Sequence, residues 1–81
     1  MEQEIKNLIE KNYKTIEIES VRVQDEVVVI RCYMKKWGTE PYIALRILNK
    51  YPKFRLVWFT GGWMEGVYTR ETLKWGGYNV K

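Results

Sequence analysis

The residues from Val27 to about Lys36 constrain the fold most strongly, because their polarity alternates with a period of two. One parity is apolar and consists of Val28, Ile30, Cys32 and Met34. The other parity starts with Val27 and Val29 and continues with Arg31, Tyr33, Lys35 and Trp37. Since successive side chains of a strand point to opposite faces of a sheet, this segment predicts a strand with one buried face and one basic, aromatic face.

A second strand is expected just before it, over residues 14–23. Apolar residues alternate with glutamates up to Ile18, and the next apolar residue, Val21, falls on the opposite parity. This slip of phase predicts a β-bulge near Ser20. A turn over residues 24–26 would join the two strands in a hairpin.

The remaining segments complete an α+β pattern in the order α-β-β-α-β-β, followed by a short helix or strand. They are a helix over 2–12, a helix from its N-cap Thr39 to about Lys50, strands over 53–60 and 63–69 joined by a Gly61-Gly62 turn, and a short helix over 69–75. Strands over 42–48 and 71–80 are the alternatives to the last two helices. We expect a single domain over 1–81, with an antiparallel sheet and helices packed on one face.

Positive charge is concentrated in the later part of the chain. Residues 1–26 carry seven acids and four bases, for a net charge of −3, whereas residues 27–81 carry three acids and ten bases, for +7. Aromatic residues make up 15% of the chain, which is more than so small a core needs. The later part therefore favours a surface for an anionic partner, although solvated strand and helix faces would also account for the charge.

The strand over 53–60 repeats the alternation of its predecessor. We expect Phe54, Leu56 and Trp58 to face the core, and Lys53, Arg55, Val57 and Phe59 to face the other way. If helices cover only the first face, the second is an open sheet surface. The predicted nucleic-acid contacts on that surface are Arg31, Tyr33, Lys35, Lys36, Trp37, Lys53, Arg55 and Phe59.

A surface of this composition suits single-stranded or structured nucleic acid. Aromatic rings on a sheet stack on unpaired bases, and neighbouring cations neutralise phosphates. The sequence therefore predicts a small basic nucleic-acid-binding module, although it contains no aromatic-rich RNP motif, GXXG clamp or helix-turn-helix. A terminal segment or a partner chain covering the rings is the competing interpretation.

The second functional prediction is a protein-interaction module. Its forms are a small inhibitor or accessory protein of viral or mobile-element type, and a homodimer joined through the sheet. Trp63 and Tyr68 are the candidate contact residues, because aromatic side chains dominate interface hot spots. Trp75 is expected to fill the core.

Catalytic and metal chemistry find little support in this composition. The chain has no histidine and one cysteine, so His-dependent catalysis, His ligation of metals and an internal disulfide are excluded. No phosphate loop or dinucleotide motif occurs. We therefore expect no enzyme, no cofactor, no metal and no membrane contact, and an intracellular, cytoplasmic protein, since no signal peptide or transmembrane segment is evident.

Overall fold

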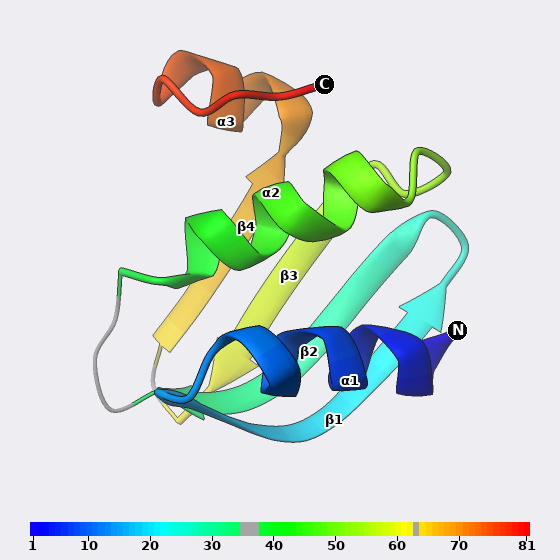
Figure 1. The fold of residues 1–81 in the computed structure, drawn as a ribbon, viewed down its shortest axis with the longest axis vertical. Helices are drawn as coiled ribbons and strands as arrows, with labels where there is room; N and C mark the ends of the chain where they lie inside the picture. The colour runs from blue at the N-terminus through cyan, green and yellow to red at the C-terminus, as the bar shows by residue number, and fades with distance from the viewer. Residues whose placement is uncertain (35–37, 63) are drawn as a thin grey trace.

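The computed structural model describes residues 1–34, 38–62 and 64–81, and it confirms the α+β order (Figure 1). The elements are α1 (Glu2–Asn12), β1 (Ile16–Gln24), β2 (Val27–Met34), α2 (Glu40–Lys50), β3 (Leu56–Gly61), β4 (Met64–Thr69) and α3 (Arg70–Trp75). Both segments with a competing strand interpretation contain a helix. Thr69 caps α3 through its side chain, which accepts a hydrogen bond from the backbone N–H of Thr72.

The four strands form one sheet in the order β1-β2-β3-β4. β1 with β2 and β3 with β4 are antiparallel hairpins, but β2 and β3 run parallel. The sheet is therefore mixed, which corrects the expectation of an antiparallel sheet. The reason is the connection through α2, because a crossover helix returns the chain to the same end of the sheet before the next strand begins.

The register of the sheet confirms the predicted β-bulge. The pairing of β1 with β2 shifts between Ile18 and Ser20. Gly61, which was predicted to lie in the turn, still belongs to β3 and pairs with Met64. A Cβ atom at Gly61 would lie 1.7 Å from the backbone oxygen of Cys32, so this position requires glycine, whereas Gly62 has the positive φ of +57°.

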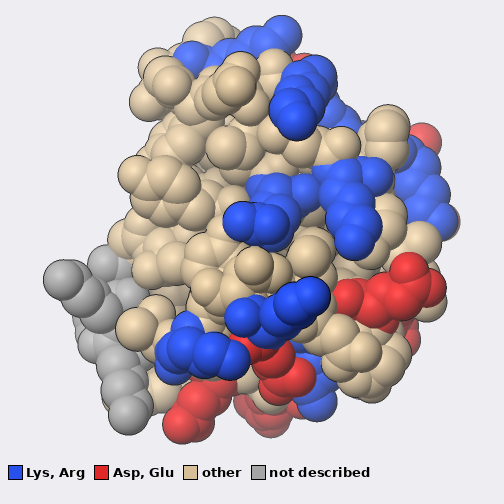
Figure 2. Space-filling view, in the orientation of Figure 1, with Lys and Arg blue, Asp and Glu red and all other residues tan. Residues whose placement is uncertain are grey.

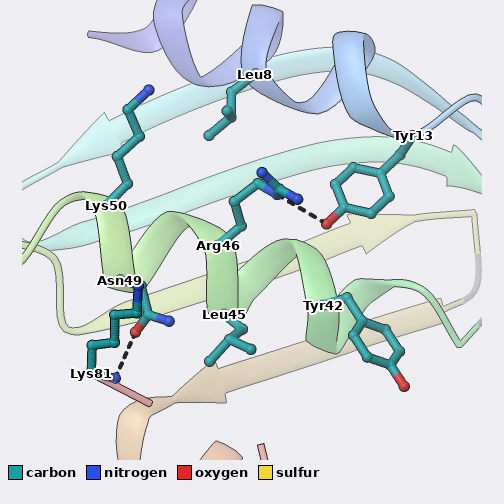
Figure 3. Close-up of a pocket in the computed structure, with 8 residues that line it drawn as sticks. All are labelled: Leu8, Tyr13, Tyr42, Leu45, Arg46, Asn49, Lys50 and Lys81. Carbon is teal, nitrogen blue, oxygen red and sulfur yellow. Dashed lines mark hydrogen bonds between the residues drawn. The ribbon is translucent and has the colours of Figure 1, made fainter. Parts of the chain in front are cut away.

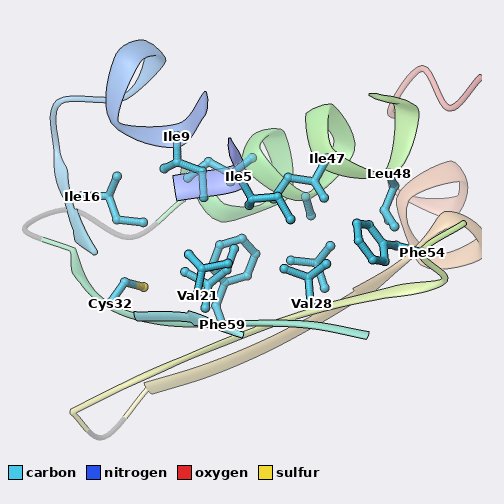
Figure 4. Close-up of a cluster of buried hydrophobic side chains, with 14 of the residues drawn as sticks. Ile5, Ile9, Ile16, Val21, Val28, Cys32, Ile47, Leu48, Phe54 and Phe59 are labelled. Atoms are coloured by element: carbon cyan, nitrogen blue, oxygen red, sulfur yellow. The ribbon is translucent and has the colours of Figure 1, made fainter. Parts of the chain in front are cut away.

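The helices cover one face of the sheet, as predicted. α1 packs over β1, and α2 packs over β3 and β4, so that both lie on the same side in Figure 1. Their apolar residues meet the inner side chains of the strands in one core (Figure 4), whose largest fully buried members include Ile5, Ile47, Phe54 and Phe59. No helix of the described residues packs on the opposite face of the sheet.

α3 lies at one end of the molecule, where Arg70 fastens it to α2. The Arg70 guanidinium donates hydrogen bonds to the backbone oxygens of Phe54 and Leu48. The Leu48 oxygen lies in the last turn of α2, where helix carbonyls lack intrahelical partners. Trp75 ends α3 with 83% of its surface exposed, which contradicts its expected place in the core. Leu73 enters the core, and Trp75, two positions later, is rotated by about 200° around the helix axis and therefore faces away from it.

Candidate functional site

The structure places two of the predicted nucleic-acid contacts on the open sheet face. Arg31 and Tyr33 lie on the exposed parity of β2, and 62% of the Tyr33 surface is accessible. Lys53 and Arg55 lie in the loop before β3 rather than in the strand. Lys35, Lys36 and Trp37 lie outside the described residues, as does Trp63.

Both described arginines of this set lie beside carboxylates. Arg31 Nε is 3.7 Å from a carboxylate oxygen of Glu19, and Arg55 Nε is 3.4 Å from one of Glu26. Lys53 instead lies over the ring of Phe54, with its Nζ 5.3 Å from the ring centroid. A phosphate at either arginine would have to compete with a neighbouring carboxylate, which weakens the predicted sheet-face site.

The predicted parity of β3 is wrong. Phe59 is fully buried in the core, and Trp58 is 38% exposed on the open face. The prediction assumed that the strand begins at residue 53, but Phe54 reaches the core from the preceding loop and the pleat begins only at Leu56. Alternation counted from Phe54 therefore assigns every following residue to the opposite face.

Tyr68, a candidate protein contact, lies on the inner side of β4. Its ring meets that of Phe59 edge to face at 5.8 Å, and its hydroxyl donates a hydrogen bond to Glu40 Oε1. Burial and the neighbouring carboxylate raise the pKa of Tyr68 to about 12. A half-buried, bonded tyrosine offers little surface for the protein contact that was predicted.

The centre of the open face is apolar rather than basic. The register sets Val29 beside Trp58 and Trp58 beside Val67, so one row of apolar side chains crosses three strands. Half of the Val67 surface is exposed. This row, Val29–Trp58–Val67, is called the apolar row below.

A groove of about 500 Å³ lies on the opposite side of the molecule, over α2 (Figure 3). It is called the helix groove below. Its lining comes from α1, from the segment after α1, from α2 and from the C-terminal segment, and comprises Leu8, Tyr13, Tyr42, Leu45, Arg46, Asn49, Lys50 and Lys81.

The helical period of α2 builds this groove. Ile43, Ala44, Ile47 and Leu48 are buried against the sheet, which leaves the remaining positions of the helix facing outward. Arg46 Nε donates a hydrogen bond to the Tyr13 hydroxyl across the groove. On the other side of α2, Asn49 Oδ1 accepts a hydrogen bond from the Lys81 backbone N–H, and Asn49 Nδ2 donates to the Asn79 oxygen.

The charged side chains among the described residues that line the helix groove are all cations. Arg46, Lys50 and Lys81 contribute three positive charges, and no Asp or Glu is among its lining residues. None of these three side chains takes part in a salt bridge within the described part of the chain. Figure 2, which shows this side of the molecule, has a broad group of basic side chains across its centre. The groove therefore suits an anion.

A second hollow has the opposite charge. It measures about 480 Å³ and lies where the β1–β2 bulge approaches the β3–β4 turn. Glu17 and Glu19 line it together with Tyr33, and no Lys or Arg is among the described residues that line it.

The buried ionisable groups of the described residues do not form a reactive centre. Burial raises the pKa of the Cys32 thiol to about 11, so it stays protonated at neutral pH. Among residues 1–34, 38–62 and 64–81, no three Cys, Asp or Glu side chains gather as metal ligands. No described helix has both the length and the apolar character that crossing a bilayer requires.

The sequence analysis did not identify the helix groove, because its cations are distant in sequence or lie on a helix. Arg46 and Lys50 are four residues apart on the outer side of α2, a pattern that most solvated helices share. Lys81 reaches them only through the folded C-terminal segment. The excess of bases after residue 26 was the available signal, and it gives no position.

Comparison with known proteins identifies no relative from which a function could be inferred. No protein-family model, no curated protein sequence and no solved structure matches this chain.

Proposed function

We propose that this protein binds nucleic acid and that the helix groove is its contact surface. The observation that carries the proposal is the lining of the groove, which among the described residues includes three cations and no Asp or Glu side chain. Cations on a nucleic-acid-binding surface neutralise phosphates and release condensed counterions, which supplies sequence-independent affinity. The net charge of +4 acts in the same direction over longer distances.

The cations of the groove can all serve as donors to phosphate. Arg46 uses its Nε for Tyr13, and its two terminal nitrogens make no hydrogen bond within the described part of the chain. Those nitrogens suit bidentate contact with phosphate oxygens. Lys50 and Lys81 add positive charges near the C-terminal end of α2. The free carbonyls at that end carry partial negative charge and do not attract anions. The attraction for a phosphate must therefore come from the lysine side chains.

A matched pair of double variants tests the proposal. Arg46→Glu with Lys50→Glu reverses two charges in the helix groove, and Arg22→Glu with Arg31→Glu makes the same net change on the open face. Anisotropy of a labelled oligonucleotide should show binding that weakens at least about tenfold in the first variant, with a salt slope lower by about 2. The second variant should change affinity much less.

Three results would contradict the proposal. If the open-face variant loses binding and the groove variant keeps it, the contact surface lies on the sheet, as the sequence analysis expected. If both variants weaken binding equally, only net charge matters. If the native protein binds no nucleic acid at low salt, the function itself is wrong.

A second candidate function, protein interaction, is favoured by the apolar row. Exposed apolar side chains that are contiguous across strands are typical of protein contacts. The homodimer form would join two copies through Val29, Trp58 and Val67. Size-exclusion chromatography with light scattering should then report a dimer that Trp58→Lys converts to a monomer, and a monomer at every concentration would remove the homodimer.

A further inference from the structure

We infer that the helix groove binds single-stranded rather than duplex nucleic acid, and that it packs an unstacked base against Tyr42 and Leu45. The inference rests on the proposed function and names its substrate class. The groove volume of about 500 Å³ lies within the range of about 300–1,000 Å³ in which small-molecule sites occur. It can therefore admit a nucleotide rather than merely touch a phosphate.

The lining of the groove is of two kinds, and only a single strand can use both. Arg46, Lys50 and Lys81 are cationic, whereas Leu8, Tyr13, Tyr42 and Leu45 are apolar or aromatic. A duplex presents its phosphates outward and keeps the faces of its bases stacked inside. It could contact the cations, but it would leave the apolar part of the groove in water. An unpaired strand offers phosphates to the first group and a base face to the second.

Tyr42 is positioned for this contact before any ligand binds. Its ring meets that of Tyr78 edge to face, with 5.2 Å between centroids and an interplanar angle of 80°. Despite this contact, 54% of its surface remains exposed. The neighbouring ring restricts Tyr42, so less side-chain entropy is lost when a base stacks on it.

The remaining polar groups of the groove favour a ligand rich in acceptors. The Asn49 amide is already engaged at both its oxygen and its nitrogen, by Lys81 and Asn79. The Tyr13 hydroxyl already accepts from Arg46. What the groove still offers is chiefly cationic N–H groups, which match phosphate oxygens.

Four ligands separate the contributions, and all of them except the duplex carry the same number of negative charges. They are a labelled single-stranded oligodeoxynucleotide, the same strand in a duplex, an abasic strand with the same number of phosphates, and polyglutamate. We expect the single strand to bind at least about tenfold more tightly than the other three, because only it supplies both a base face and phosphates.

Variants at Tyr42 identify the stacking contact. Tyr42→Ala should weaken single-strand binding by about 5- to 150-fold, the range that the loss of one stacked base corresponds to. It should leave binding of the abasic strand unchanged, and Tyr42→Phe should retain the native affinity. Circular dichroism should show that each variant is folded, because Tyr42 is largely exposed and its ring is not part of the core.

The outcomes distinguish this inference from the proposed function. Equal binding of single strand, duplex and abasic strand, still lost in the Arg46→Glu, Lys50→Glu variant, would overturn the inference and leave nucleic-acid binding in place. Absence of binding to every nucleic acid would overturn both. Polyglutamate that binds as tightly as the single strand would indicate an acidic protein partner and would also overturn both.

Discussion

The two sides of this molecule differ in how their charges are arranged. On the open sheet face, acids and bases intermix: Arg31 lies beside Glu19, and the hollow at one end contains two glutamates. On the helix side, Arg46, Lys50 and Lys81 line one groove, and no Asp or Glu is among its described lining residues. The open face instead has an apolar centre. A count of bases along the chain does not distinguish these arrangements, since attraction for an anion depends on which charges are neighbours in space.

The comparison also separates two chemistries that the sequence analysis had combined. Exposed rings and basic residues were expected together on the sheet. In the structure, Tyr33 and Trp58 lie on the open sheet face. The three cations of the helix groove lie with Tyr13 and Tyr42 on the helix side. Each side is therefore suited to a different contact, the helix groove to an anion and the apolar row to a protein surface.

The largest expected effect comes from neighbouring residues on opposite sides of β3. Phe59→Ala removes a fully buried ring and should lower the free energy of unfolding by about 3–5 kcal/mol. Trp58→Ala, on the open face, should lower it by a smaller amount, about 1–2 kcal/mol, because 38% of that residue's surface is already in water. Urea denaturation measures both values. Equal losses would mean that the two faces of β3 are assigned incorrectly.

The next effect contrasts two arginines. Arg70→Met removes hydrogen bonds to the Leu48 and Phe54 carbonyls and should lower the free energy of unfolding by about 1.5–3 kcal/mol. Arg46→Met removes an exposed side chain whose one hydrogen bond is to Tyr13, and should change stability by less than about 1 kcal/mol. Thermal unfolding measures the two changes in stability. Oligonucleotide anisotropy should show the reverse order for binding, with the larger loss of affinity in Arg46→Met. A loss of affinity in Arg70→Met alone would contradict the proposal that the helix groove is the contact surface.

The next effect is on stability at high pH and concerns Tyr68 on the inner side of β4. Since the pKa of Tyr68 is about 12 in the folded protein and about 10 is usual, the folded state holds this proton more tightly than the unfolded state. Its contribution to stability is therefore complete below about pH 10 and is lost as pH rises towards 12. Denaturation at several alkaline pH values should show this decline, and Tyr68→Phe should reduce its slope. An unchanged slope in the variant would assign the decline to other groups, such as Cys32.

The smallest effect tests the ion pair of the open face. Arg31 and Glu19 are both largely exposed, so Arg31→Gln should change the free energy of unfolding by no more than about 1 kcal/mol. It should also leave oligonucleotide affinity nearly unchanged, because this arginine lies on the side away from the helix groove. A large loss of affinity in Arg31→Gln would contradict the proposal that nucleic acid binds on the helix side rather than on the open face.

The secondary structure was largely predictable because its signals are local. The helical stripe of α1, the slip of phase at Ser20 and the Thr69 cap each depend on residues within a few positions of one another. The pattern of β3 was misread at one point, since Phe54 looks like a strand residue but enters the core from a loop. One misplaced boundary reversed the expected positions of Trp58 and Phe59.

The candidate site could not be predicted in the same way. Its predicted members divide among the open face, the loop before β3, the core and the part of the chain outside the described residues. The helix groove joins Leu8, Arg46 and Lys81, which are far apart along the chain. No local pattern relates them, because their proximity follows from the packing of α1, α2 and the C-terminal segment.

The sequence by itself determined the type and order of the elements, the absence of histidine chemistry and the excess of positive charge. These properties follow from composition, alternation and capping, which act over a few residues. Only the tertiary structure decided that β2 and β3 run parallel, that Phe59 faces inward and that three cations line one groove over α2. Those outcomes depend on how the crossover helix and the chain end return to the sheet, and each therefore requires contacts between distant parts of the chain.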